Sequence, residues 1–235
     1  MSTSGKPTIE ELITLCNFDG ENYVQKSGDE YVSALSRLFS LDNRNDKPFT
    51  VEDIRNQPLL SEFAFAGKND FKKVCTLSIS PLVIQASTRK RTNEKIVAKD
   101  FVSAEAKRVY ESSLGVAYLM TCKIDGDERI IKIGQTRKTF KERLGSYNCG
   151  CVYNWRTAST TNLKLKQSMV ATRQDIQLYL YDCQQTEIFV YHGIKSAPFA
   201  TAYSLAVEDI MIKQFMHQFG KKPLVNIQAN AGDNE

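Results

Sequence analysis

The chain has 235 residues, of which 42% are hydrophobic and 25% charged, and its formal net charge is +4. This composition excludes a collagen-like, a coiled-coil or a wholly disordered chain, and the length fits one large domain or two small ones. No segment reaches the roughly 18 apolar residues of a membrane span, and the N-terminus has no apolar signal core, so we expect a soluble, cytoplasmic protein. Its six cysteines are therefore expected to be reduced thiols.

The positive charge is concentrated in one stretch. Residues 129–173 contain ten lysines and arginines and one acidic residue. Such a stretch favours a polyanionic partner, because each phosphate that is neutralised releases counterions, although a solvated basic surface is an alternative. Charge alone therefore favours nucleic acid as the partner.

The N-terminal part of the chain shows mainly helical patterns. Apolar spacing predicts helices over residues 8–16 and 29–40, and Thr50 with Asp53 has the spacing of a capping box for a short helix. Residues 74–87 mix β-branched side chains with a proline, which indicates an irregular pair of strands. The basic run 87–95 fits a loop, a linker or an arm that contacts phosphates.

The patterns become sharper after residue 114. Two β-rich runs flank Asp125-Gly126-Asp127 and predict a β-hairpin. A further strand is predicted over residues 175–183, and helices are predicted over 138–147, 161–171 and 202–219. This order predicts an α+β fold, a small antiparallel or mixed sheet flanked by helices, with a mostly helical N-terminal region.

The predicted hairpin brings a tyrosine and a lysine together. If its turn uses three residues, 125–127, then Tyr118 lies opposite Gly134, with Lys132 diagonally adjacent on the same face. The glycine leaves space above the phenol, and the ammonium group is expected to lower the pKa of the phenol. A two-residue turn would shift the register by one residue and separate the pair.

Two later helices add polar groups of other kinds. Arg143 and Tyr147 are four residues apart, so they share a helix face and can reach one phosphate together. Glu208 stands beside an apolar stripe of the last helix, whereas Asp209 points elsewhere. A salt bridge, the helix N-terminus or a hard cation such as Mg²⁺ would each suit this carboxylate.

Together these residues resemble the GIY-YIG nucleases over roughly residues 114–228. Val116-Ala117-Tyr118 corresponds to the first motif and Lys132-Ile133-Gly134 to the second, followed by the helical Arg143, the late Glu208 and a closing Asn226. Valine replaces the first glycine of the family. Lysine replaces the second tyrosine, a change that resembles the restriction-endonuclease branch of the family.

The resemblance implies a DNA endonuclease of restriction or phage type, with one Mg²⁺ or Mn²⁺ per active site. Tyr118, activated by Lys132, would be the general base, Arg143 and Tyr147 would contact the scissile phosphate, and Glu208 would hold the metal. Residues 1–110 would serve recognition or dimerisation, residues 111–228 would form the nuclease domain and residues 229–235 a disordered tail. The expected partners are double-stranded DNA and a second copy of the chain, with no membrane and no nucleotide cofactor.

Other basic and polar residues are expected to contact DNA. They are Arg137, Lys138, Lys141, Arg156, Lys164, Lys166 and Asn226. Asn226 would bond to a neighbouring backbone or phosphate and steady the sheet edge, although a simple turn residue is an alternative. The arrangement of Cys149, Cys151 and Cys183 lacks zinc-site spacing and is better explained by small buried hydrophobes. The alternative function is a nucleic-acid-binding protein without catalysis, and an RNA-directed nuclease is a third possibility.

Overall fold

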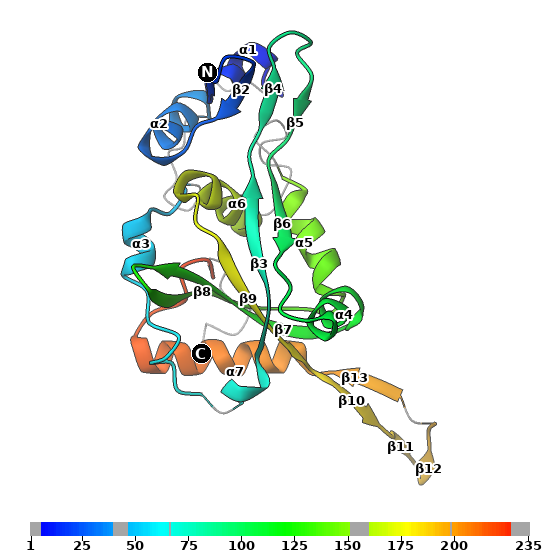
Figure 1. Ribbon diagram of the computed structural model, residues 1–235. Helices are drawn as coiled ribbons and strands as arrows, with labels where there is room; N and C mark the ends of the chain where they lie inside the picture. Colours follow the sequence, from blue (N-terminus) through cyan, green and yellow to red (C-terminus); the bar gives the residue numbers. More distant parts are fainter. Residues whose placement is uncertain (1–5, 40–46, 66, 151–159, 198, 227–235) are drawn as a thin grey trace.

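The computed structural model describes residues 6–39, 47–65, 67–150, 160–197 and 199–226. Its centre is an antiparallel five-stranded sheet in the order β6-β3-β9-β7-β8 (Figure 1). The strands are β3 (Lys72–Ser80), β6 (Lys95–Lys99), β7 (Val116–Ile124), β8 (Asp127–Thr136) and β9 (Ile176–Asp182). The predicted α+β class, an antiparallel sheet flanked by helices, is confirmed.

The β7–β8 hairpin closes through two residues. Asp125 and Gly126 both have positive φ, 54° and 92°, and Ile124 pairs with Asp127. An Asp-Gly pair suits this backbone because glycine, and to a lesser degree aspartate, tolerates left-handed conformations. The three-residue turn expected from the sequence is therefore wrong.

A β-bulge restores the register that the shorter turn would have changed. Thr121 pairs with Ile130, whereas Met120 pairs with Lys132, so Ile131 is an extra residue in β8. Beyond the bulge, Tyr118 lies opposite Gly134, as expected, and Lys132 shares its face. Two deviations from the expected hairpin thus cancel before the strand reaches the candidate site.

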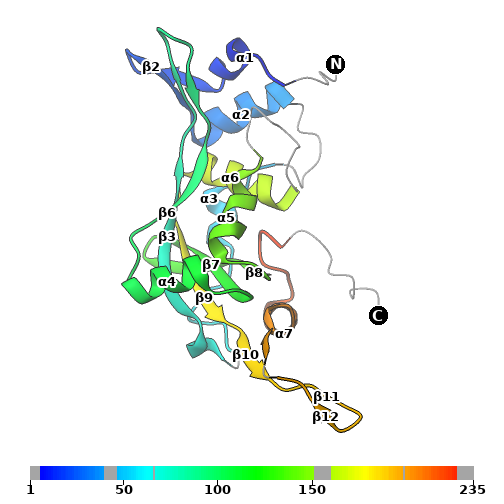
Figure 2. The same ribbon diagram turned by 90° about the vertical axis from the view of Figure 1, so that its right-hand side faces the viewer.

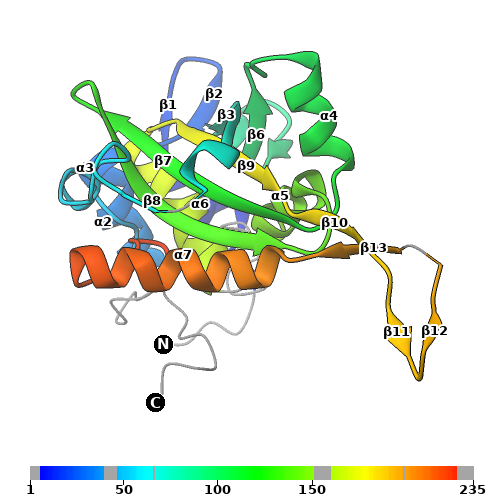
Figure 3. The ribbon, with the colours of Figure 1, turned by 90° about the horizontal axis from the view of Figure 1, so that it is seen from below.

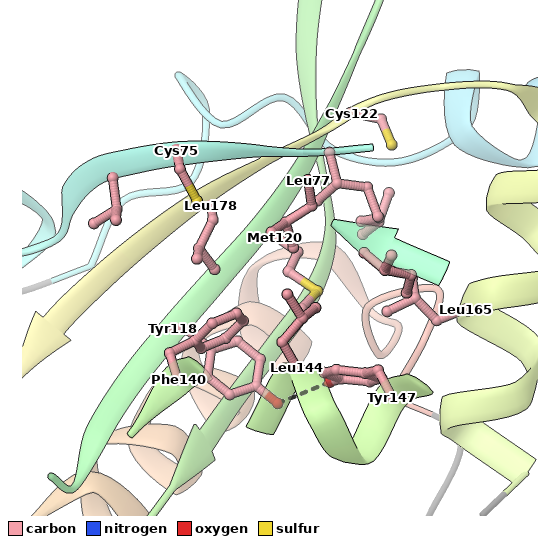
Figure 4. Close-up of a cluster of buried hydrophobic side chains, with 14 of the residues drawn as sticks. Cys75, Leu77, Tyr118, Met120, Cys122, Phe140, Leu144, Tyr147, Leu165 and Leu178 are labelled. Atoms are coloured by element: carbon pink, nitrogen blue, oxygen red, sulfur yellow. Dashed lines mark hydrogen bonds between the residues drawn. The ribbon is translucent and has the colours of Figure 1, made fainter. Parts of the chain in front are cut away.

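Helices cover both faces of the sheet. On one face lie α4 (Ala104–Ser112), α5 (Phe140–Asn148) and α6 (Thr160–Thr172). Helices α5 and α6 join the core cluster around β7 through Phe140, Leu144 and Leu165 (Figure 4), and α4 joins it through Tyr110. On the other face lies α7 (Ser204–Phe219), whose Met211 and Phe215 contact Leu119 and Ile133 (Figure 3). Because side chains alternate along a strand, β7 sends Tyr118 toward α5 and Leu119 toward α7.

Several predicted helices are confirmed, namely those at 29–40, 138–147, 161–171 and 202–219. The capping box of Thr50 with Asp53 is also present, at the start of α3 (Val51–Arg55). The first helix is shorter than expected: α1 (Ile9–Ile13) is followed by strand β1 (Cys16–Phe18), and α2 spans Gly28–Phe39. Helix α4 was not expected from the sequence. No helix of the described residues is long and apolar enough to span a membrane.

The N-terminal region is mixed, where mostly helical structure was expected. Strands β1, β2 (Asn22–Gln25), β4 (Val83–Gln85) and β5 (Arg91–Thr92) form a second sheet at the far end from α7 (Figures 1 and 2). The run 74–87 does contain two strands, but β3 and β4 belong to different sheets, separated at Pro81.

The expected boundary near residue 110 is not a boundary of the central sheet. Strands β3 and β6 precede it, yet β3 pairs with β9 and β6 pairs with β3. In addition, the side-chain amide of Asn148, at the end of α5, donates to the carbonyl of Ile96 and accepts from its N–H, both at 2.8 Å. A recognition or dimerisation role for residues 1–110 stays a prediction.

A hairpin arm that the sequence patterns did not reveal projects from the sheet between β9 and α7 (Figures 1 and 3). Its base consists of β10 (Gln184–Glu187) and β13 (Phe199–Ala202), and its tip of β11 (Val190–Tyr191) and β12 (Ile194–Lys195). A local signal for its tip is nevertheless present, because the β-rich run 188–191 precedes His192-Gly193, whose positive φ angles of 48° and 79° suit a two-residue hairpin turn.

Candidate active site

Five predicted site residues come from four elements around one end of the β7–β8 hairpin. Tyr118 lies on β7, Lys132 on β8, Arg143 and Tyr147 on α5, and Glu208 on α7. Hydrogen bonds join Tyr118, Arg143 and Tyr147. Lys132 and Glu208 interact electrostatically with Arg143 and with each other. Their roles in chemistry remain predictions.

Tyr118 occupies the space above Gly134. A Cβ atom at Gly134 would overlap the far end of the Tyr118 ring, so only glycine leaves room for the phenol in this position. The ring also meets Phe140 edge-on, with 5.1 Å between ring centroids. The glycine and the phenylalanine therefore hold the phenol in place, pointing toward α5 (Figure 4).

The two phenols and the guanidinium group form one network. The hydroxyl oxygens of Tyr118 and Tyr147 lie 2.9 Å apart. Arg143 donates from Nε to the Tyr118 hydroxyl at 3.3 Å and from Nη2 to the Tyr147 hydroxyl at 3.5 Å. Its guanidinium carbon also lies 4.6 Å from the Tyr147 ring centroid. One partly exposed arginine thus joins two buried phenols.

Burial decides the protonation of the two phenols. It raises the pKa of Tyr118, and the opposing effects come from Arg143 and from the hydrogen bond with Tyr147. Burial likewise raises the pKa of Tyr147 well above its usual value. The sequence-based expectation that Lys132 lowers the pKa of Tyr118 is therefore wrong, because desolvation of a buried phenolate outweighs the nearby positive charge.

The pKa of the Lys132 side chain is shifted toward neutral pH. Only 5% of the residue is exposed, and its Nζ donates to the Val225 carbonyl at 3.4 Å. Burial lowers its pKa to about 8; the positive charge of Arg143 adds to this effect, and Glu208 opposes it. A buried ammonium with a cationic neighbour loses its proton more easily than one in water. The contact of Lys132 with the Val225 carbonyl could not be predicted from the sequence, because every residue has a backbone carbonyl group.

Glu208 lies in the first part of α7 and interacts with the same cations. Burial raises the pKa of its carboxyl group, while Lys132 and Arg143 both oppose the rise. The start of α7 is fixed to β8, because the Ser204 hydroxyl donates to the Gln135 side-chain oxygen at 3.2 Å. Asp209 points elsewhere, as expected, and pairs with Lys213 at 2.9 Å.

The donor set around Glu208 fits a hard cation with few protein ligands. Among the described residues, no three side chains of histidine, cysteine, aspartate or glutamate gather in one place. A lone carboxylate suits Mg²⁺ or Mn²⁺, which keep water and phosphate oxygens in the remaining positions, and does not suit a zinc ion. Of the three cysteines weighed as a zinc site, Cys183 is buried, Cys149 is exposed, where a buried side chain was expected, and Cys151 lies outside the described residues.

Asn226 binds the free edge of β8. Its side-chain amide donates to the Ile133 carbonyl at 2.8 Å, and its oxygen accepts from the Ile133 N–H at 3.1 Å. The neighbouring Val225 N–H donates to the carbonyl of the bulged Ile131 at 2.9 Å. Asn226 therefore makes the backbone contact that was expected of it, and its contact with phosphate stays a prediction.

The other predicted DNA contacts divide into exposed and buried residues. Arg137, Lys138 and Lys141 are exposed beside the start of α5, although Lys138 lies 3.9 Å from Glu142 and Lys141 3.3 Å from Glu111. Such exposed pairs are weak and leave the lysines able to bind phosphate.

Two lysines of α6 and one arginine complete the predicted DNA contacts. Lys164 is partly exposed. Lys166 is fully buried, so the expectation that it contacts DNA is wrong, because a side chain without exposed surface cannot reach a phosphate. Arg156 lies outside the described residues.

Comparison with known proteins finds one solved structure to report. No protein-family model matches the chain, and no curated protein matches it. The chain is similar to a solved structure described as restriction endonuclease HPY188I in complex with product DNA, at 23% sequence identity and a TM-score of 0.47. The match covers 80% of this chain and 97% of that chain.

Proposed function

We propose that this chain is a metal-dependent endonuclease of GIY-YIG type that hydrolyses phosphodiester bonds of duplex DNA, as a restriction or phage-type enzyme. The observation that carries the proposal is the contact of Arg143 with the hydroxyl groups of both Tyr118 and Tyr147. Lys132 and Glu208 interact with the same arginine. A guanidinium group, two phenols, a deprotonable amine and a carboxylate suit phosphate hydrolysis.

Arg143 is the residue that we assign to the scissile phosphate. Burial by itself lowers the pKa of Arg143, but the interactions with the two phenols outweigh this effect and raise it, so the guanidinium group stays charged. It is partly exposed, and its two donor nitrogens are already oriented by tyrosine hydroxyls. Held in this way, it would stabilise negative charge that develops on the phosphate in the transition state.

Lys132 is the better of two proton acceptors for the attacking water. With a pKa of about 8, roughly a tenth of Lys132 side chains are neutral at pH 7. Tyr118 has a raised pKa and is a weaker candidate, because its phenolate is rarer at that pH. We therefore assign proton transfer to Lys132 and orientation of the water to the hydroxyl groups of Tyr118 and Tyr147.

Glu208 is the proposed ligand of the metal ion. Its carboxylate is partly buried and has no acidic cluster around it in the described structure, which fits one Mg²⁺ or Mn²⁺ with open positions. When bound, such an ion neutralises charge on the phosphate and on the departing 3′ oxygen. Burial raises the pKa of this carboxyl group, and the positive charges of Lys132 and Arg143 oppose the rise.

The proposed substrate is double-stranded DNA, cut by two copies of the chain. Exposed Arg137, Lys138 and Lys141 lie next to the candidate site and suit flanking phosphates. Each chain carries one set of site residues, so cleavage of both strands calls for two chains, as in a symmetric dimer on a palindromic target.

The proposal is tested by plasmid cleavage. Supercoiled plasmid is incubated with the purified chain and excess Mg²⁺, with EDTA in the control. We expect nicked or linear product with Mg²⁺ and none with EDTA or with Arg143→Ala. Retardation of DNA without cleavage under Mg²⁺ or Mn²⁺ would instead support the alternative, a nucleic-acid-binding protein. Cleavage of single-stranded RNA in preference to DNA would contradict the DNA assignment.

A further inference from the structure

The tip of the hairpin arm presents an apolar face to solvent. Ile194 is 75% exposed, Tyr191 65% and Phe189 59%. Tyr191 pairs with Ile194 across β11 and β12, and Phe189 lies two residues before Tyr191, so all three share one face. The rings of Phe189 and Tyr191 are stacked, with 6.4 Å between centroids and 14° between planes.

This face is unusual for a surface that remains in water. Scattered single apolar residues are common on protein surfaces, but contiguous apolar patches mark interaction sites. An isolated two-stranded ribbon is also marginal in water and gains stability when its apolar face is covered. The arm stands away from both helical layers, so its tip is placed to meet another molecule (Figures 1 and 3).

The balanced charge of the arm favours a protein partner over DNA. Residues 184–202 contain one acidic residue, Glu187, and one basic residue, Lys195. A surface that binds a polyanion carries a surplus of lysine and arginine, as residues 129–173 do. The opposite face of the tip, with Val190 beside Lys195, has no such surplus either. An apolar, neutral ribbon therefore fits an apolar protein surface.

We propose that the arm holds a second copy of this chain, with the face formed by Phe189, Tyr191 and Ile194 buried in the dimer. The inference rests on the proposed function, which calls for two sites on one duplex. The arm continues the central sheet from β9 and leads directly into α7, which carries Glu208. A copy held by this arm would therefore be attached through a segment that adjoins this helix in the chain. The two arms of a symmetric dimer would each bury this face.

The test is the oligomeric state of the full chain in the absence of DNA. Sedimentation equilibrium compares the parent chain with the double variant Tyr191→Ser, Ile194→Ser. We expect a dimer for the parent and a dissociation constant at least about tenfold higher for the variant, since apolar anchors dominate such interfaces. The matched control is Phe18→Ser, which removes another residue that is more than half exposed, in the N-terminal sheet, and is expected to stay dimeric.

The outcomes distinguish a failure of the arm as the dimer contact from a failure of the proposed nuclease activity. A monomeric parent chain at about 50 μM, or an arm variant that dimerises like the parent, would overturn it. A monomeric parent whose arm variant loses affinity for DNA would assign the arm to DNA and overturn it as well. The far-ultraviolet circular dichroism spectrum of the variant is expected to match that of the parent, which would show that the variant is folded. A dimer that depends on the arm but cuts no DNA supports the arm and contradicts the nuclease. With an active parent, the variant is expected to nick plasmid and to lose linear product.

Discussion

The hydroxyl oxygens of Tyr118 and Tyr147 lie 2.9 Å apart, although one residue is on a central strand and the other near the end of a helix. Arg143 donates to both. The contact depends on the bulge at Ile131, which gives β7 and β8 their register, and on Gly134, which leaves room for the Tyr118 ring. Small changes in this part of the hairpin are therefore expected to affect cleavage more than folding.

Gly134→Ala is expected to displace the phenol of Tyr118. The new methyl group overlaps the buried ring, which must move away from Tyr147 and Arg143. We therefore expect the cleavage rate to fall at least about a hundredfold and the free energy of unfolding to fall by about 1–3 kcal/mol. Plasmid cleavage and urea denaturation measure the two effects. The control is Gly145→Ala in α5, where a Cβ meets nothing within 4 Å, and a small gain in stability is expected. Equal activity of the two variants would contradict the proposed geometry.

Arg143→Lys is expected to lose most of the cleavage activity while keeping the positive charge. An ammonium group cannot donate to both hydroxyls and to a phosphate in the planar geometry of a guanidinium group, so a fall of roughly 10²–10³ in the single-turnover rate is expected. DNA affinity should change by less than about tenfold, because the flanking lysines remain. Arg108→Lys is the control, since that exposed residue pairs with Glu105 in α4. A rate close to that of the parent would remove Arg143 from the phosphate.

The pH dependence of cleavage is expected to follow Lys132. As proton acceptor it acts in the neutral form, so the rate rises about tenfold per pH unit below pH 8 and levels off near its pKa of about 8. Lys132→Arg keeps the charge but cannot deprotonate, and is expected to be inactive at every pH. If Lys132→Arg retains the parent's rate and profile, Tyr118 is the acceptor.

Lys132 is also expected to lower stability at neutral pH. The unfolded lysine titrates near pH 10.4 and the folded one near 8, so unfolding takes up a proton between these values. The free energy of unfolding therefore falls as pH drops from about 10.4 to 8 and is constant below that. Lys132→Met removes this effect and is expected to gain about 1–3 kcal/mol at pH 7. Thermal unfolding at pH 7 and pH 10 measures it, and a destabilised variant at pH 7 would contradict the expectation.

Glu208→Gln is expected to abolish cleavage under Mg²⁺ while DNA binding persists. The amide keeps the size of the side chain but removes the charge that would hold the cation. Asp209→Asn is the matched control, because Asp209 is the next residue and pairs with Lys213 at the surface. Titration of Mg²⁺ against single-turnover cleavage compares the two variants. Cleavage by Glu208→Gln at the parent rate and with the parent's Mg²⁺ dependence would show that the metal assignment is wrong.

Asn226→Ala is expected to loosen the free edge of β8. It leaves the N–H and carbonyl groups of Ile133 without their partners, at a cost of about 1–2 kcal/mol in urea denaturation. Asn17→Ala is the control, because that amide makes one exposed contact, with Glu30, and a change within about 0.5 kcal/mol is expected. Equal effects of the two substitutions would mean that Asn226 does not support the strand.

Local sequence signals predicted much of the half of the fold that carries the candidate site. The Asp125-Gly126 pair marks a hairpin turn, and the helices that carry Arg143 and Glu208 follow from apolar spacing. The pairing of Tyr118 with Gly134 was predicted from a wrong turn and holds because the bulge at Ile131 compensates. A bulge depends on the strands and edge contacts around it, such as the Val225 bond to Ile131, and short-range patterns do not report those.

The sequence by itself determined which chemical groups are available and the order in which local elements carry them. The tertiary structure decided how they behave. Burial makes Lys132 easier to deprotonate and Tyr118 harder, and it removes Lys166 from the surface. Pairing over long separations adds β3 and β6 to the central sheet, and the arm exposes an apolar face. Desolvation and strand pairing depend on residues far apart in the chain, so a local pattern cannot contain them.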